Sequence, residues 1–210
     1  MIVRLVWFVI LGCCLLLVLP RASTERILAE NGPIEMPTAI AYFVAAMMLW
    51  FSSAQRRWHA EIPGTVLLIA GGLRELDFQA RFTTGYAFSS RFFLQASTPL
   101  VQKTAVAAVL LMLASMFTLL VVYNWRRFLR AFQAHETWAQ SFALAASLIF
   151  ISTALDEMGG FLRRHYPNAI DPMFIMWVFE ESLEALIPVL FATAIVQAAT
   201  VPAAERRHAA

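Results

Sequence analysis

Six apolar runs, each long enough or nearly long enough to cross a lipid bilayer, divide this chain of 210 residues. A membrane-spanning helix needs about 20 predominantly apolar residues. Only 14% of the residues are charged, whereas a soluble domain carries roughly a quarter. The sequence therefore predicts an all-α, polytopic integral membrane protein that forms a bundle of six transmembrane helices. The predicted spans lie near residues 3–20, 36–54, 62–79, 104–124, 139–161 and 173–199.

The connectors between these runs are short, so residues 1–210 are predicted to form a single transmembrane domain. Prolines stand close to the ends of several runs, where they fit the start or the end of a helix. Pro188 lies inside the sixth run and is expected to kink it, as prolines often do in membrane helices.

The first run, residues 3–20, has two interpretations: a transmembrane helix or a cleaved secretory signal. It contains the two cysteines, Cys13 and Cys14, which we expect to be packed or lipid-facing thiols because adjacent cysteines rarely bridge each other. The residues that follow Leu19 read "PRAST" and lack a small-x-small cleavage site. The sequence therefore favours a first transmembrane helix.

Six spans would put both termini on the same side of the membrane as the loops after helices two and four. Arginine and lysine are almost evenly divided between the two sides, so their count alone hardly decides the orientation. The basic segment "NWRRFLR" and four tryptophans that resemble an interfacial belt fall on the side of the termini: Trp50, Trp58, Trp125 and Trp138. We predict a cell-membrane protein, in a bacterial inner membrane, with cytoplasmic termini.

Nucleic acid is excluded as a partner. The formal net charge is only +2, and the basic residues occur singly or in pairs between apolar runs rather than in a patch interleaved with aromatics. The predicted partners are the lipid bilayer and either another membrane protein or further copies of this chain.

The acidic residues gather in four segments that the order of the spans brings to one side of the membrane. These segments are "AENGPIEM", "GGLRELDFQARF", "ISTALDEMGGFLRRH" and "FEESLEAL". The main candidates for an ion-binding or ligand-binding site are Arg74, Glu75, Asp77, Asp156, Glu157, Glu180, Glu181 and Glu184. The secondary candidates are Glu30, Glu35, Arg81, Arg163 and Arg164.

The third span is expected to carry charges into the membrane. Only 16 residues separate Arg57 from Arg74, about 24 Å of helix, which is short of a hydrocarbon core of roughly 30 Å. Residues from Arg74 to Asp77 must then complete the span. Charged groups at that depth normally face the bundle interior or a water-filled cavity and pair with one another.

Helical spacing predicts which side chains share a face. Glu180 and Glu184 lie four residues apart, whereas Glu181 is turned aside. Three further stripes are expected: Arg74, Asp77 and Arg81 in helix three; Thr153, Asp156, Glu157 and Gly160 in helix five; and the small residues Ala139, Ala143 and Ser147, which would admit a neighbouring helix.

Two interpretations of the acidic residues stay open. The charges could form ion pairs that hold helices three, five and six together, with Arg74 as the main counter-ion. They could instead bind a proton, a metal ion or a polar substrate, since carboxylates outnumber the deep arginine. No cofactor is predicted. A hard cation such as Mg²⁺, Ca²⁺ or Mn²⁺ is the metal that would suit Glu75, Asp77, Glu180 and Glu184.

The remaining sequence features say less about function. His165 follows two arginines and is expected on the surface, and no metalloprotease, serine-hydrolase or phosphate-loop motif occurs, so catalytic residues stay unknown. The pairs Gly71–Gly72 and Gly159–Gly160 could loosen their helices or allow close packing. The segment "RFTTGYAFSSRFF" could cover the acidic cavity or lie as a linker on the membrane surface.

These features favour a cation-linked or proton-linked transporter or channel over an enzyme. The first alternative is a non-catalytic membrane subunit or assembly factor that uses its charges to dock helices or a partner. The second is an intramembrane metal-dependent hydrolase.

Overall fold

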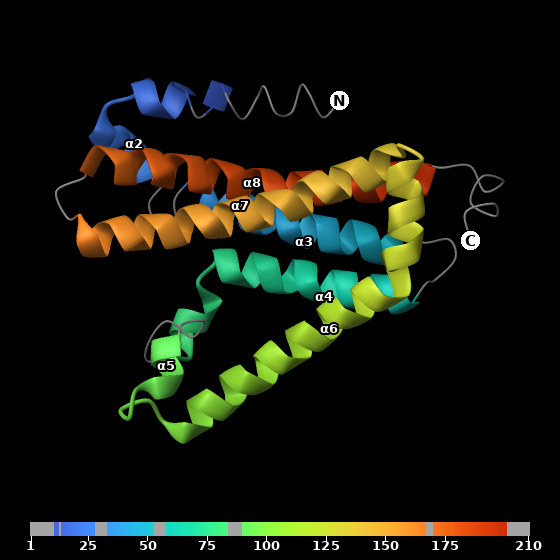
Figure 1. The fold of residues 1–210 in the computed structure, drawn as a ribbon, viewed down its shortest axis with the longest axis horizontal. Helices are drawn as coiled ribbons and strands as arrows, with labels where there is room; N and C mark the ends of the chain where they lie inside the picture. Colours follow the sequence, from blue (N-terminus) through green and yellow to red (C-terminus); the bar gives the residue numbers. More distant parts are fainter. Residues whose placement is uncertain are drawn as a thin grey trace.

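The computed structural model describes residues 11–27 apart from 13, 33–52, 58–83, 90–166 and 170–200. Within these ranges all regular secondary structure is helical, as the sequence predicts (Figure 1). The α-helices are α2 (Arg21–Ile27), α3 (Glu35–Phe51), α4 (Trp58–Glu75), α5 (Ser90–Leu94), α6 (Leu100–Gln133), α7 (Thr137–His165) and α8 (Ile170–Thr200). A short 3-10 helix, η1 (Phe78–Arg81), follows α4.

Three of these helices are long and apolar enough to cross a membrane: α6, α7 and α8. Helix α3 is a shorter apolar helix, and α4 carries Glu61, Arg74 and Glu75 among its 18 residues. The structure therefore supports a helical protein with three candidate spans, which is fewer than the six that the sequence predicts. Residues 3–10 and 13 of the first predicted span lie outside the described residues.

Helices α3, α4, α7 and α8 run side by side as a bundle (Figure 1). Helix α7 packs mainly on α8, while α4 and α8 each pack on α3 more extensively than on one another. The core of the bundle is made of apolar residues from all four helices: Tyr42, Ala45, Ala46, Leu68, Ala145, Leu148, Leu186, Ile187 and Leu190. Helix α3 is therefore the element that joins α4 to the α7–α8 pair.

Small residues set the packing of α7. Its buried stripe is Ser141, Ala145, Leu148 and Ser152, at spacings of four, three and four residues, which is the period of one helix face. The small-residue stripe that we expected from the sequence is wrong in part, since Ala139 is buried but Ser147 is exposed. The stripe that begins at Thr153 points outward because it is rotated away from the buried one.

The glycine pair in α4 allows close helix packing. A Cβ atom added at Gly71 would lie 2.8 Å from Cε1 of Tyr42, and one added at Gly72 would lie 3.2 Å from the carbonyl oxygen of Ala39. Helix α4 continues through both glycines without a break. The alternative of a loosened helix is therefore wrong here, and α7 likewise continues through Gly159 and Gly160.

Helix α8 also continues through a proline. Pro188 is one of the most completely buried residues of the described chain and lies inside the 31-residue helix. Membrane helices tolerate such a proline when neighbouring elements pack around it. The sixth apolar run is thus one continuous helix that carries three glutamates in its first half.

Helix α6 departs from the bundle. In Figure 1 it runs obliquely from Leu100 toward α4 and bends in its last turns toward the start of α7. Near this bend the His59 ring of α4 stacks on the Tyr123 ring of α6, with centroids 4.5 Å apart. None of the most apolar stretch of α6 is buried within the molecule.

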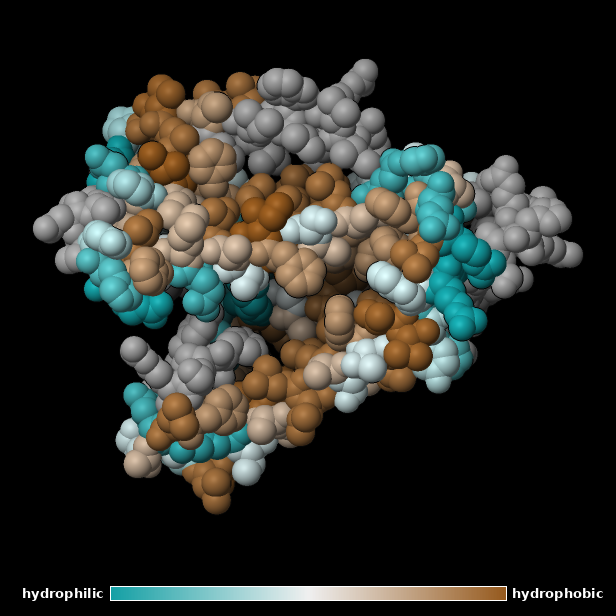
Figure 2. Space-filling view, viewed as in Figure 1, coloured by the Kyte–Doolittle hydropathy of each residue, from teal (hydrophilic) through white to brown (hydrophobic). Residues whose placement is uncertain are grey.

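The surface of the molecule is apolar along its middle. Figure 2 shows hydrophobic residues over the flanks of the bundle and hydrophilic residues toward its ends. A water-exposed surface of this kind would be unfavourable, because each Å² of exposed apolar area costs about 25 cal/mol. The distribution suits a chain whose flanks contact lipid.

Candidate functional site

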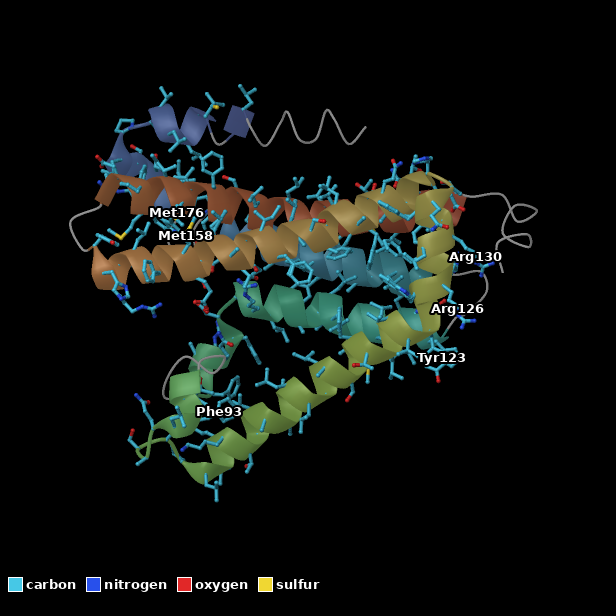
Figure 3. All side chains as sticks on the ribbon, in the orientation of Figure 1. Phe93, Tyr123, Arg126, Arg130, Met158 and Met176 are labelled. Atoms are coloured by element: carbon cyan, nitrogen blue, oxygen red, sulfur yellow. The ribbon has the colours of Figure 1, made fainter. Side chains whose placement is uncertain are left out.

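One end of the bundle collects the acidic segments. The start of α3, the end of α4, the last part of α7 and the start of α8 lie at this end (Figure 1). Figure 3 places Met158 of α7 and Met176 of α8 there, and Arg126 and Arg130 of α6 at the opposite end. The alternating direction of the helices therefore assembles these segments, as the order of the predicted spans implies.

The centre of this end is the carboxylate of Glu184 on α8. Arg74 on α4 donates a hydrogen bond from Nη2 to Oε1 of Glu184 at 2.8 Å, and Ser152 on α7 donates one from Oγ to the same oxygen at 2.5 Å. The Glu184 side chain is only 12% exposed, whereas the Arg74 side chain is 47% exposed. A single oxygen thus joins three helices.

A second carboxylate, that of Glu75, lies beside this junction. Glu75 is 8% exposed, and its carboxylate forms no hydrogen bond or ion pair with any residue that the structure describes. It interacts electrostatically with both Glu184 and Arg74. Glu75 is therefore a buried acid that faces the junction without a direct partner in it.

Tyr42 of α3 lies against the same site. Its ring packs on the backbone of α4 at Gly71, one helical turn before Glu75. The residue is 8% exposed, and it interacts electrostatically with Glu75, Glu184 and Arg74. Tyr42 therefore contributes a buried phenol ring to the site from the α3 side.

The remaining glutamates of α8 are Glu180 and Glu181. Glu181 accepts a hydrogen bond from Nε1 of Trp177 at 3.1 Å and interacts electrostatically with Glu184. Glu180 is half-buried and interacts electrostatically with Asp156 of α7 and with Glu184. The three glutamates of α8 therefore lie close enough to interact with one another, and Glu180 interacts with Asp156 of α7 as well.

The first predicted loop contains two further acidic candidates, Glu30 and Glu35. Glu35 opens α3 and interacts electrostatically with Glu75 and Glu181. Glu30 lies outside the described residues. The acidic end of the bundle thus receives a carboxylate from α3 as well as from α4 and α8.

The predicted stripe of Arg74, Asp77 and Arg81 does not form. Helix α4 ends at Glu75, and Asp77 adopts a left-handed backbone conformation, with φ of 44°, as it leads into η1. The Asp77 carboxylate has no hydrogen bond or ion pair among the described residues. The helix stops two residues too early for Asp77 to continue the face of Arg74.

The charged residues near the end of α7 lie at the surface. Asp156, Glu157, Arg163 and Arg164 are exposed, because the buried stripe of α7 ends at Ser152. His165 is exposed too, and its ring stacks on that of Phe161, as expected for a surface histidine. Of this segment, Asp156 and Arg163 interact with the site through their charges on Glu180.

A metal site does not follow from this arrangement. Among the described residues, no three histidine, cysteine, aspartate or glutamate side chains are grouped so that they could hold a metal ion. The four residues that the sequence offers as hard-cation ligands do not form such a group, and one of them, Asp77, lies beyond the end of α4. Glu184, a second member of the set, is already paired with the guanidinium of Arg74.

Sequence reasoning missed Tyr42, Ser152 and Trp177 as parts of the site. Tyr42 is the most polar ring in its apolar run, and Ser152 follows Leu148 on the stripe that begins at Ser141. Trp177 precedes Glu181 by four residues, which is the spacing at which helical side chains meet. These residues and spacings are visible in the sequence, but their role in the site depends on which helices pack against one another.

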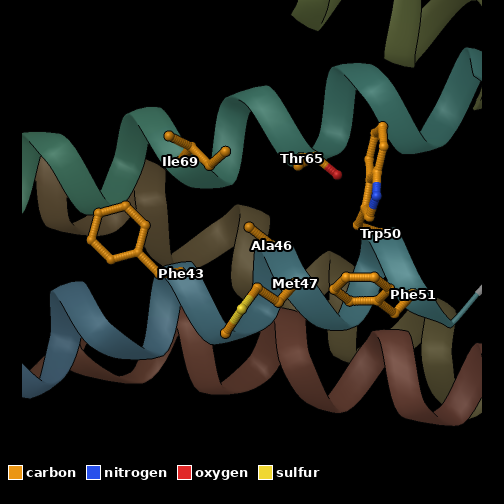
Figure 4. Close-up of a pocket in the computed structure, with 7 residues that line it drawn as sticks. All are labelled: Phe43, Ala46, Met47, Trp50, Phe51, Thr65 and Ile69. Atoms are coloured by element: carbon orange, nitrogen blue, oxygen red, sulfur yellow. The ribbon is translucent and has the colours of Figure 1, made fainter.

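A separate pocket of about 170 Å³ lies between α3 and α4 (Figure 4). Aromatic and aliphatic side chains line it, together with Thr65, whose buried hydroxyl oxygen has no hydrogen-bond partner among the described residues. Trp50 and Phe51, which close α3, mark its position away from the acidic end. The pocket is therefore not part of the charged site.

No protein-family model, no curated protein and no solved structure matches this chain. Its chemistry must be inferred from the site itself. Arg74 and Ser152 donate hydrogen bonds to Glu184, while Glu75 supplies a second carboxylate that is buried beside them. An isolated buried carboxylate is strongly unfavourable as an anion, so such a group takes up a proton or attracts a cation.

Proposed function

We propose that this protein is a small six-helix membrane transporter or channel that moves protons or other small cations. The site would lie between α3, α4, α7 and α8, in the outer half of the membrane. The observation that carries the proposal is the buried carboxylate of Glu75, which lies next to the ion pair between Arg74 and Glu184. Charged groups inside a membrane bundle are costly and commonly mark a path for ions or protons.

The membrane arrangement is part of the proposal. Helix α4 has 18 residues, about 27 Å of helix, which nearly spans a hydrocarbon core of roughly 30 Å. Its packing alongside α3 and α6 supports a membrane-spanning role despite its charged ends. Together with α3 and the first apolar run this gives six spans, with both termini in the cytoplasm of a bacterial cell.

The direct test is ion flux into vesicles that contain the purified full-length protein. Vesicles would be loaded with a pH-sensitive dye, and a membrane potential imposed with potassium and valinomycin would drive proton entry. We expect the wild-type protein to acidify the vesicles faster than protein-free vesicles. The Glu184→Gln variant should lose most of this flux, because Gln cannot carry the negative charge that pairs with Arg74.

The matched control is Glu157→Gln. Glu157 is exposed on α7 and has no hydrogen bond or ion pair with the described part of the chain. We expect this variant to keep wild-type flux. Parallel vesicles with gradients of Na⁺, K⁺, Mg²⁺, Ca²⁺ and Mn²⁺ identify the ion that is moved. If the flux of the wild-type protein equals that of protein-free vesicles for every ion, the proposal is overturned.

A non-catalytic subunit is the second candidate, and the exposure of α6 favours it. The most apolar part of α6 has no residue buried within this chain, so another membrane protein could pack on it. Gentle purification from the native membrane would separate the two: one stoichiometric partner that is lost on α6 substitution supports a subunit, whereas flux by the isolated chain supports the transporter.

A further inference from the structure

Glu75 and Glu184 occupy different environments although they share one site. Glu184 accepts hydrogen bonds from Arg74 and Ser152, which stabilise its negative charge. Glu75 is 8% exposed and has neither a hydrogen bond nor an ion pair among the residues that the structure describes. When two carboxyl groups in one site differ in this way, the one without partners is the one that holds a proton.

The charged and titratable groups that face Glu75 come from three helices. Arg74 precedes it on α4, and the others are Glu35 and Tyr42 of α3 and Glu181 and Glu184 of α8. Within this set the carboxylates outnumber the guanidinium. A negative charge on Glu75 would therefore meet more repulsion than attraction, in a position that water barely reaches.

Arg74 connects the protonation state of Glu75 to the contact between α4 and α8. These two helices pack on α3 far more than on one another, so the hydrogen bond from Arg74 to Glu184 is a direct polar link between them. Arg74 is adjacent to Glu75 in the chain, and its side chain is 47% exposed, which leaves it room to move. An ionised Glu75 would compete with Glu184 for the same guanidinium.

We infer that Glu75 is a proton-binding site and that loss of its proton weakens the link from Arg74 to Glu184. The inference rests on the proposed function in that it names the proton as the cation that is moved. In the protonated state Glu75 is neutral and Arg74 pairs with Glu184. Release of the proton to water leaves the Glu75 carboxylate, which draws Arg74 away and loosens α4 from α8.

The test is infrared difference spectroscopy of the full-length protein in lipid nanodiscs as the pH is raised. A protonated carboxylic acid has its own C=O stretching band, which disappears when the proton leaves. We expect the wild-type protein to lose such a band, the Glu75→Gln variant to lack the change, and the Glu157→Gln variant to retain it. Glu75→Asp keeps a carboxyl group and should shift the band rather than remove it. This variant keeps the test decisive if Glu75→Gln folds poorly.

A second readout follows the link between the helices. Spin labels on the lipid-facing sides of α4 and α8 would report their separation, which should increase with pH in the wild-type protein and stay constant in Glu75→Gln. A band that persists unchanged in Glu75→Gln, or a wild-type protein without any band, would overturn the inference. Flux without the band would reject Glu75 as the proton site but would still support transport. A band without flux would support Glu75 as the proton site but reject transport.

Discussion

Arg74 on α4 and Glu184 on α8 are joined by a 2.8 Å hydrogen bond although 110 positions of the chain separate them. The contact places a guanidinium and a carboxylate between two helices that each pack on α3 more extensively than on one another. The pair is asymmetric in exposure, since the Glu184 side chain is 12% exposed and the Arg74 side chain is 47% exposed. Its strength should therefore lie between that of a surface ion pair and that of a fully buried one.

A double-mutant cycle between Arg74 and Glu184 would measure this contact. We expect Arg74→Gln and Glu184→Gln to couple by about 1 kcal/mol in the free energy of unfolding, because water screens the exposed side of the arginine. Unfolding in mixed micelles supplies the free energies. The cycle of Arg164→Gln with Glu184→Gln is the control and should be additive, since Arg164 is exposed on α7. Additivity in both cycles would contradict a direct contact.

Ser152 should contribute to stability through the same oxygen of Glu184. Ser152→Ala removes a buried donor, and we expect it to lower the free energy of unfolding by about 1 kcal/mol. The matched control is Ser147→Ala on the same helix, whose hydroxyl is exposed and bonds the carbonyl oxygen of Ala143. That control should change stability by less than about 0.5 kcal/mol. Equal effects of the two substitutions would mean that the bond to Glu184 adds no stability.

The close approach of α3 and α4 at Gly71 gives a packing test. Gly71→Ala would put a methyl group 2.8 Å from Cε1 of Tyr42, and such overpacking typically destabilises by about 1–3 kcal/mol. Gly159→Ala is the control, because a Cβ added there meets nothing within 4 Å. It should be neutral or stabilising by up to about 1 kcal/mol, since alanine favours the helix. The thermal midpoint of the purified protein distinguishes the two, and a stabilised Gly71→Ala protein would show that the helices are further apart.

The six-span arrangement predicts that the two ends of α6 lie on opposite sides of the membrane. Ser97 lies in the connector just before α6, and His135 lies in the turn between α6 and α7. Single cysteines at these positions, in a chain whose Cys13 and Cys14 are changed to serine, would be treated with a membrane-impermeant maleimide. We expect Ser97→Cys to react in intact cells and His135→Cys only after the membrane is opened. Reaction of both in intact cells would contradict the topology.

The carboxylates illustrate how far sequence reasoning could reach. The order of the apolar runs places Glu75, Glu157 and Glu184 toward one end of the bundle. In the structure the end of α4, the last part of α7 and the first part of α8 lie at that end (Figure 1). Their depth could not be inferred in the same way. Glu75 and Glu184 lie within the bundle and Glu157 on its surface, because the rotation of each helix about its own axis depends on which neighbour buries it.

The sequence alone determined the helical class, the positions of the four apolar helices α3, α6, α7 and α8, and the end of the bundle that carries the acids, because hydrophobic run length and chain direction are local properties. Only the tertiary structure decided that α4 ends before Asp77, that Ser152 rather than Asp156 meets α8, and that Glu75 is buried without a partner. These outcomes depend on contacts between residues far apart in the chain. Close packing of the helices at small residues such as Gly71 and Ala145 determines which side chains are buried and which ones meet.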